Sequence, residues 1–482
     1  MRFKPPGRHR TVEEFRAYLR ALDPSLDCDP SCEGDGGPLG WPLEFRGRTL
    51  TNRFCIHPME GWDAEPNGLP SDLTLRRWRG FGRSGAKLIW GGEAFAVQAD
   101  GRANPRQLYL NPEVDVGAGL ARLFHAVREG HREIGEDPDE LYIGLQLTHS
   151  GRFARPEGPP APRLAAHHPV LDARAGAGPD TPLLTDGELE DIAERYVDAA
   201  ELAWRVGFDF VDVKCCHGYL LHELLGARSR PGRYGGDFEG RTSLFRQIVS
   251  AIHSSCPELE IGVRASLADV FPFSADDDGV GAPVGWREHV PYDNGFGVDA
   301  DDPRRFDLTE PLRVLELLRD LDIGIVNATA GSPYYCPHLQ RPATYPPSDG
   351  YQPPQDPLLE VARHLHLVRR CKQHLPELLF VGTGYSYLQE WLPHVAQYEL
   401  RRGHVDLIGL GRMTLSYPEL PRDVLAGEPM ARKLICRTFS DCTTGPRNGL
   451  VSGCYPLDER YKKMPEAKSL REIKERLKEE RA

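Results

Sequence analysis

The sequence has 482 residues, of which 40% are hydrophobic and 27% are charged, which is typical of a folded globular protein rather than a disordered chain. Its formal net charge of −12 disfavours binding to nucleic acid or to an anionic membrane. No apolar run reaches the length of about 18 residues that a membrane span needs, and no apolar stretch follows the basic N-terminus. We therefore expect a cytoplasmic protein. The 11 cysteines are odd in number, which argues against a secreted disulfide framework.

Much of the chain alternates between short apolar runs and helical patterns. The runs are rich in Val, Ile and Phe, which is typical of parallel strands covered on both faces. Thr185 and Glu188 form a capping box at the start of one predicted helix, and Gly207 follows the last apolar residue of that helix. The runs predict strands at 54–57, 87–90, 141–147, 210–213, 260–264, 323–327, 378–381 and 405–410.

Strands that alternate with helices in this way indicate the α/β class and a (β/α)8 TIM barrel. An open doubly wound sheet would give a similar pattern, but no G-x-G-x-x-G phrase follows the first strand. We divide the chain into an N-terminal extension, a barrel and a C-terminal extension, at 1–45, 46–425 and 426–482. Long loops at 155–181, 272–307 and 334–357 each follow a predicted strand. In a barrel we expect them at the C-terminal mouth, where active sites lie.

Ionisable side chains follow the predicted strand at 210–213. Lys214, His217 and Tyr219 come within a few residues of its end. A tyrosine can donate a proton, and a histidine or lysine can polarise a carbonyl oxygen. On these residues alone, a structural role for His217 is the simpler alternative.

Two phrases in this region carry a resemblance to a known family. Residues 214–225 read K-C-C-H-G-Y-L-L-H-E-L-L, and residues 234–241 read Y-G-G-D-F-E-G-R. In order and spacing they resemble the H-G-A-H-G-Y-L-x-x-x-F-L and Y-G-G-S-x-E-N-R phrases of the Old Yellow Enzyme family. The resemblance implies an FMN-binding barrel that takes electrons from NAD(P)H and reduces an activated C=C bond of a small molecule.

The resemblance also implies cofactor contacts at the ends of several strands. Pro58 and Met59 would line the flavin, Gly92 would lie at its edge, and Gln146 would bind its pyrimidine. Arg264 would place a permanent positive charge near flavin N1. Loop amides and an arginine after the last two strands would hold the FMN phosphate. These residues are Gly382, Gly384, Gly411 and Arg412.

The resemblance implies catalytic roles but is not complete. Tyr219 matches the family's proton donor, and His217 matches one of two groups that bind a substrate carbonyl. The other group is a His or Asn in many members, whereas this chain has Lys214. Some members have a Cys or Thr that tunes the flavin at the position of Glu60. The sequence does not decide whether Glu60 faces the flavin or the solvent.

Cysteines after the barrel resemble part of a cluster motif. Larger relatives, like dienoyl-CoA reductase and trimethylamine dehydrogenase, carry a [4Fe–4S] cluster here, and the spacing from Cys442 to Cys454 matches theirs. Phe439 stands where a further cysteine is required, so the ligand set is incomplete. We favour a remnant that binds no metal. A cluster with a ligand such as Asp441, and a zinc site that includes Cys436, stay open.

The larger relatives continue into FAD- and NAD-binding domains, whereas only a charged helical pattern at 468–481 follows here. We therefore expect electrons from NAD(P)H bound over the flavin, or from a partner protein. Reduction of a C=C bond is the leading hypothesis. The alternatives are an FMN-dependent dehydrogenase or demethylase that oxidises an amine or alcohol, and a non-catalytic flavin-binding barrel. The substrate, the choice between NADH and NADPH, and a homo-oligomeric state do not follow from the sequence.

Overall fold

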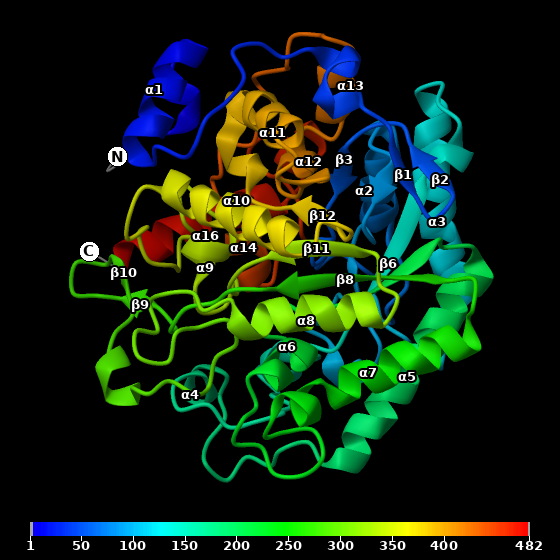
Figure 1. Ribbon diagram of the computed structural model, residues 1–482, viewed down its shortest axis with the longest axis vertical. Coiled ribbons are helices and arrows are strands. Elements are labelled where there is room, and N and C mark those ends of the chain that lie inside the picture. Colours follow the sequence, from blue (N-terminus) through cyan, green and yellow to red (C-terminus); the bar gives the residue numbers. More distant parts are fainter. Residues whose placement is uncertain (1–2, 481–482) are drawn as a thin grey trace.

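The computed structural model describes residues 3–480, and at its centre is a closed barrel of eight parallel strands (Figure 1). The strands pair in chain order, and the last pairs with the first through Ile408 and Phe54. The predicted strands and the predicted barrel are confirmed, and the open sheet is excluded. The barrel strands are β3 (Phe54–Ile56), β4 (Leu88–Ile89), β6 (Tyr142–Thr148), β7 (Phe210–Val213), β8 (Glu260–Ser266), β11 (Ile325–Thr329), β12 (Leu379–Gly382) and β13 (Leu407–Leu410).

Helices follow the strands and bury their apolar faces against the outside of the barrel. The predicted capping box is present, because the Thr185 hydroxyl accepts from the Glu188 amide at 3.1 Å and the Glu188 carboxylate accepts from the Thr185 amide at 2.8 Å. Gly207 ends this helix at φ 105°, as predicted. The outer helices are α2 (Asp72–Arg83), α3 (Val116–Glu133), α5 (Asp186–Val206), α7 (Phe238–Ser255), α8 (Thr309–Asp320), α10 (Pro357–His374), α11 (Leu392–Arg401), α12 (Met413–Ser416) and α13 (Leu420–Leu425).

Large side chains fill one end of the barrel interior. Tyr142 stacks on Phe210 with ring centroids 5.1 Å apart, and Trp90 meets Phe210 edge-on at 5.2 Å. A hairpin of β1 (Leu43–Phe45) and β2 (Arg48–Leu50) packs against this cluster. This end is therefore a packed core, and a ligand has to enter from the opposite end, at the carboxyl ends of the strands.

The two extensions pack against the barrel. In α1 (Val12–Leu22), Phe15 stacks on Trp391 with ring centroids 5.4 Å apart. The predicted charged helix is α16 (Glu466–Glu479), although Arg481, which the prediction included, lies outside the described residues. Lys474 of α16 pairs with Asp441 at 2.8 Å, which fixes the helix to the segment that follows the barrel.

Short elements make up the connections, and many of them lie near the C-terminal mouth. Within residues 3–480, no helix is long and apolar enough to cross a membrane. The short strands are β5 (Ala94–Ala96), β9 (Ser274–Ala275) and β10 (Gly281–Ala282). The short helices are η1 (Pro6–Arg8), η2 (Gly34–Gly36), η3 (Pro38–Gly40), η4 (Ala99–Gly101), η5 (Pro138–Glu140), η6 (Gly151–Phe153), α4 (Leu171–Arg174), α6 (Leu220–Leu225), η7 (Trp286–His289), α9 (Pro337–Gln340), η8 (Tyr385–Trp391), α14 (Asp441–Arg447) and α15 (Glu459–Lys462).

Candidate functional site

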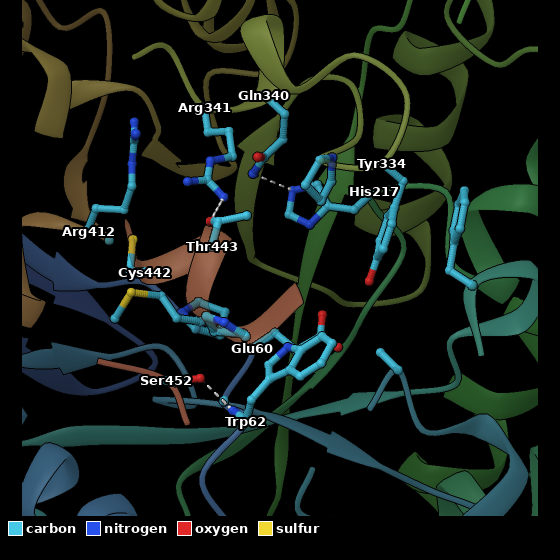
Figure 2. A pocket seen from close by; sticks show the side chains of 18 of the residues that line it. Glu60, Trp62, His217, Tyr334, Gln340, Arg341, Arg412, Cys442, Thr443 and Ser452 are labelled. Atoms are coloured by element: carbon cyan, nitrogen blue, oxygen red, sulfur yellow. Dashed lines mark hydrogen bonds between the residues drawn. The ribbon is translucent and has the colours of Figure 1, made fainter. Parts of the chain in front are cut away.

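A cavity of about 610 Å³ opens at the C-terminal mouth of the barrel (Figure 2). Segments that follow the barrel strands form its floor and walls. Of the three long loops expected at this mouth, 155–181 and 334–357 line the cavity, whereas 272–307 contributes no lining residue among those described. A wall also comes from the C-terminal extension, through α14 and Ser452.

The cavity brings together most of the predicted site residues. Those that line it are Pro58, Met59, Gln146, Lys214, His217, Arg264, Gly384, Gly411 and Arg412. Three others lie behind this lining. Tyr219 is only 1% exposed. Gly92 supports the lining residue Met59, because its carbonyl accepts a hydrogen bond from the Met59 amide at 3.3 Å. Gly382 is the last residue of β12 and comes immediately before the lining residue Thr383.

A buried carboxylate, Asp212, organises the cavity floor. It accepts hydrogen bonds from the Gln146 side-chain amide at 2.6 Å, the Trp90 indole at 2.7 Å and the Arg264 backbone amide at 2.7 Å. Burial raises the pKa of Asp212 above its ordinary value. Because the amide nitrogen of Gln146 is used in this contact, its carbonyl oxygen is left as an acceptor for the cavity.

Arg264 supplies the positive charge of the floor. Its guanidinium donates to the Pro58 carbonyl at 3.0 Å, while its Nε atom is buried without a hydrogen-bond partner. Burial lowers the pKa of this arginine. An arginine remains protonated even so, and it can therefore stabilise negative charge that develops in the cavity above it.

Two arginines meet at one end of the cavity, next to glycine-containing turns. Arg341 donates to the Thr443 hydroxyl, and Arg412 donates to the Pro342 carbonyl at 2.7 Å. Buried nitrogens of both guanidiniums have no partner, and neither guanidinium forms an ion pair with a carboxylate among residues 3–480. Burial, followed by repulsion from Arg412, lowers the pKa of Arg341 to about 10. Such an uncompensated pair attracts an anion with several oxygen acceptors, such as a phosphate.

A chain of hydroxyl and carboxyl groups lies at the other side of the cavity. Tyr219 donates to the Glu60 carboxylate, and its hydroxyl also bonds to the Tyr334 hydroxyl at 2.7 Å. The Lys214 ammonium lies 3.8 Å from the centre of the Tyr219 ring. Glu60 therefore faces the cavity rather than the solvent, which settles the question that the sequence left open.

His217 occupies a tight turn next to this chain of groups. Its φ is 66°, its backbone amide donates to the Ser266 hydroxyl at 3.0 Å, and its Nε2 lies 3.3 Å from the amide nitrogen of Gln340. Burial, followed by the charges of Arg264 and Lys214, lowers the pKa of His217 well below its ordinary value. The ring is therefore neutral at pH 7 and offers one donor and one acceptor nitrogen.

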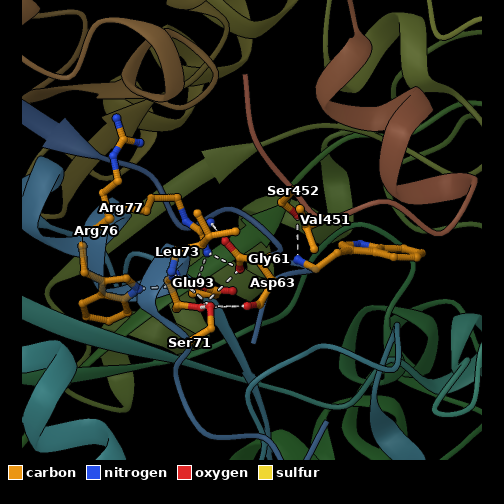
Figure 3. A network of polar contacts seen from close by, with 12 residues as sticks. Gly61, Asp63, Ser71, Leu73, Arg76, Arg77, Glu93, Val451 and Ser452 are labelled. Carbon is orange, nitrogen blue, oxygen red and sulfur yellow. Dashed lines mark hydrogen bonds and ion pairs between the residues drawn. The ribbon is translucent and has the colours of Figure 1, made fainter. Parts of the chain in front are cut away.

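A buried ion-pair network supports the loop that carries Glu60 (Figure 3). Arg77 donates to Glu93 at 2.6 Å and to Asp63 at 2.8 Å. A Cβ atom at Gly61 would lie 1.6 Å from the Glu93 carboxylate. A side chain at position 61 would therefore displace the Glu93 carboxylate from this network.

The C-terminal extension closes one wall through polar contacts. The Trp62 amide donates to the Ser452 hydroxyl at 2.6 Å (Figure 2). Arg76 donates to Asp458 at 2.9 Å. These contacts, with the bond from Arg341 to Thr443, attach the extension to the barrel.

The sulfur atoms of Cys436, Cys442 and Cys454 do not all lie within 4.8 Å of one another, although Cys454 is near enough to the other two for their charges to affect its pKa. Cys442 lines the cavity, whereas Cys436 and Cys454 do not. Among residues 3–480, one group of three potential ligand atoms lies within 4.8 Å, namely His131, Glu136 and Glu140, and it excludes the three cysteines. That group already surrounds a cation, because the Lys87 ammonium lies 2.6 Å from Glu140 and 3.1 Å from Glu136.

Several lining residues were not predicted from the sequence. Arg341 and Tyr334 reach the cavity from the loop at 334–357, and Thr443 reaches it from α14. The spacing between Arg341 and Thr443 is 102 residues, so no short pattern could indicate that they meet. The one sequence feature that could have indicated Arg341 is its position in a long loop that follows a predicted strand and was expected at the barrel mouth.

The chain is similar to known oxidoreductases. A family model described as the NADH:flavin oxidoreductase / NADH oxidase family matches residues 38–280. A protein of Gibberella zeae named NADH:flavin oxidoreductase FG08077 is 29% identical over 252 residues, which cover 48% of this chain and 58% of that protein. An NADPH dehydrogenase of Geobacillus sp. is 28% identical over 260 residues, which cover 52% of this chain and 67% of that protein.

Solved structures resemble the chain over a longer stretch. A structure described as a complex of 2-naphthoyl-CoA reductase with 2-naphthoyl-CoA has a TM-score of 0.64 and 16% sequence identity, and the match covers 88% of this chain and 57% of that one. Morphinone reductase has a TM-score of 0.54 and 20% identity, and the match covers 82% of this chain and 91% of that one. At these identities the structures support the shared barrel fold.

Proposed function

Because the chain belongs to the NADH:flavin oxidoreductase / NADH oxidase family, we propose that it binds FMN and uses NAD(P)H to reduce an activated C=C bond of a small molecule. The observation that carries this proposal is the donor set of the cavity. Unpartnered arginines lie at one end, and an arginine and an oriented amide lie on the floor. The proposal includes a cytoplasmic location, where NAD(P)H is supplied.

The side chains of the cavity fit FMN. Arg341 and Arg412, with the backbone amides near Gly384 and Gly411, would hold the phosphate. Gln146 would present its carbonyl to the pyrimidine N–H, and Arg264 would lie against the part of the ring that becomes negative on reduction. Pro58 and Met59 would line the ring, with Gly92 and Gly382 supporting the backbone behind them.

FMN would supply hydride chemistry, by accepting a hydride from NAD(P)H and passing it to an electron-poor carbon. The protein would bind and protonate the substrate. We propose that His217 and Lys214 hold its electron-withdrawing group, since both line the cavity and can donate hydrogen bonds. Tyr219 would give a proton to the α-carbon.

Oxidation of an amine or alcohol is the second candidate. It is favoured by one observation, the hydrogen bond from Tyr219 to the Glu60 carboxylate. A carboxylate in this position can accept a proton that leaves a substrate through the tyrosine. The hydride would then pass from the substrate to the flavin.

We propose that 46–425 form the FMN-binding barrel, with 1–45 and 426–482 as extensions. The C-terminal extension completes the cavity wall.

We also propose that Cys436, Cys442 and Cys454 are the remnant of a metal site that no longer binds metal. Iron and zinc analysis of the purified protein tests this, because a stoichiometric metal would contradict it.

Anaerobic titration tests the function directly. The purified protein is reconstituted with FMN and mixed with NADPH, then with 2-cyclohexenone as a probe alkene. We expect NADPH to bleach the flavin absorbance and the enone to restore it. Failure to bind FMN would exclude the proposal, and bleaching by an amine or alcohol but not by NADPH or NADH would favour the second candidate.

A further inference from the structure

Glu60 lies in the cavity in contact with the proposed proton donor. One carboxylate oxygen accepts the Tyr219 hydroxyl hydrogen bond, and the other is buried without a hydrogen-bond partner. The residue follows Met59 on the loop after β3, which the network of Arg77 and Glu93 supports. This carboxyl group is therefore held at the site and has spare hydrogen-bonding capacity.

Tyr219 is a poor acid by itself. Burial, followed by the charge of Glu60, raises its pKa well above the ordinary value. Its other hydroxyl partner, Tyr334, also has a raised pKa because of burial. A bare tyrosinate at position 219 would thus be costly, and a carboxylic acid is a much stronger acid than a second tyrosine.

Other charged and titratable groups surround Glu60 and Tyr334. The charge of Glu60 raises the pKa of Lys214 against the larger lowering effect of burial. Cys216 also lies within the field of Glu60, but burial raises its pKa to about 12, so it stays a neutral thiol. Arg155 and Arg447 act on the neighbouring Tyr334.

We propose that Glu60 exchanges a proton with Tyr219 in each turnover, and so acts through the tyrosine as its proton source. This inference rests on the proposed function, in which Tyr219 protonates the substrate. If the enzyme oxidises its substrate instead, the same two groups transfer the proton in the opposite direction, from the substrate through Tyr219 to Glu60.

The proton transfers balance. NAD(P)H supplies the hydride, with its electron pair, that reaches the β-carbon. At the α-carbon a C–H bond forms as the O–H bond of Tyr219 breaks. The O–H bond of protonated Glu60 breaks as the O–H bond of Tyr219 forms again. Glu60 is left as a carboxylate near the Lys214 ammonium, and solvent in the open cavity returns to it the one proton that the reduction consumes.

The test is the reoxidation of the reduced FMN enzyme by 2-cyclohexenone in a stopped-flow instrument. For Glu60→Gln we expect the rate at pH 7 to fall about 100-fold, the order expected for loss of a general acid. In H2O–D2O mixtures, a plot of the rate against the fraction of D2O should be curved for the wild type, in which two protons move, and linear for the variant, in which one moves.

Controls separate this inference from folding and from the proposed function. Asp349→Asn makes the same carboxylate-to-amide change in the same cavity, at a side chain that pairs with Arg447 at 3.2 Å, and its rate and its plot should match those of the wild type. Both variants are checked for FMN affinity and melting temperature. A wild-type rate and a curved plot in Glu60→Gln would overturn the inference. If Tyr219→Phe also reoxidises at the wild-type rate, the proton role of Tyr219 fails with it.

Discussion

The side-chain amide of Gln146 donates to the Asp212 carboxylate at 2.6 Å on the floor of the cavity. This contact sets the direction of the amide, because a carboxylate accepts hydrogen bonds and cannot donate one while it is ionised. The carbonyl of Gln146 then faces the space that we assign to the flavin pyrimidine.

Asp212→Asn should weaken FMN binding. The new amide can donate to Gln146, so the glutamine can turn and present its NH2 group to the pyrimidine N–H in place of its carbonyl. Loss of one such hydrogen bond costs about 1–2 kcal/mol, or about a tenfold increase in Kd. Titration of the apoprotein, followed by flavin fluorescence, measures this change. An unchanged Kd would show that Asp212 does not orient the amide.

Arg341→Gln should reduce the preference of the protein for FMN over riboflavin. These flavins differ by the phosphate, which we place between Arg341 and Arg412 because their buried nitrogens have no partner. We expect the FMN Kd to rise about 10- to 100-fold, since a charge-assisted hydrogen bond contributes about 1.5–3 kcal/mol. The riboflavin Kd should change little.

Arg447→Gln is the matched control for this experiment. Arg447 lines the same cavity, but it already pairs with Asp349 at 3.2 Å. Its loss should leave the ratio of the FMN and riboflavin affinities unchanged. An equal loss of affinity for both flavins in Arg341→Gln would place this arginine away from the phosphate.

The sequence predicted those parts of the fold and site that depend on local patterns. Strand ends carry Lys214, His217 and Arg264 into the cavity because every parallel strand of a barrel ends at the same mouth. Short continuous apolar runs mark strands that are buried on both faces, so the strand bounds needed only small corrections. No bound shifted by more than two residues: β11 begins at Ile325 rather than Ile323, and β13 begins at Leu407 rather than Val405.

Contacts between distant segments could not be predicted in this way. Glu60 turns inward because of Tyr219, a partner 159 residues away, and no periodic pattern continues beyond the strand end to indicate its direction. Thr443 belongs to an extension whose docking depends on separate polar contacts, such as that of Ser452 with Trp62. Long-range packing decides these positions, and one sequence contains no signal of it.

Gly61→Ala should destabilise the loop that carries Glu60. The new methyl group would lie 1.6 Å from the Glu93 carboxylate and 2.8 Å from the Arg77 guanidinium, and both groups are fixed by their ion pair. Overpacking of a buried site costs about 1–3 kcal/mol, which should lower Tm by several degrees. Gly187→Ala, where nothing lies within 4 Å of the new atom, should leave Tm unchanged or raise it slightly. Equal Tm values for the two variants would contradict the tight fit at position 61.

Acid should destabilise the turn beside the proposed proton donor through His222. Its Nδ1 accepts from the Gly218 amide at 3.0 Å, which requires a neutral ring, and burial lowers its pKa to about 4 from an ordinary 6.5. The unfolded chain therefore binds more protons than the folded one between pH 6.5 and 4. This histidine's contribution to stability is present above that window and is lost as the pH falls through it.

His222→Asn measures that contribution, because asparagine keeps an acceptor for the Gly218 amide but does not titrate. From pH 7 to pH 5, the unfolding free energy of the wild type should fall by about 2 kcal/mol more than that of the variant. Urea denaturation at the two pH values, followed by circular dichroism, gives both numbers. The comparison removes the effects of other buried histidines, such as His168 and His364, because they are the same in both proteins. Parallel losses in the two proteins would mean that His222 stays protonated, or stays exposed to water, in the folded state.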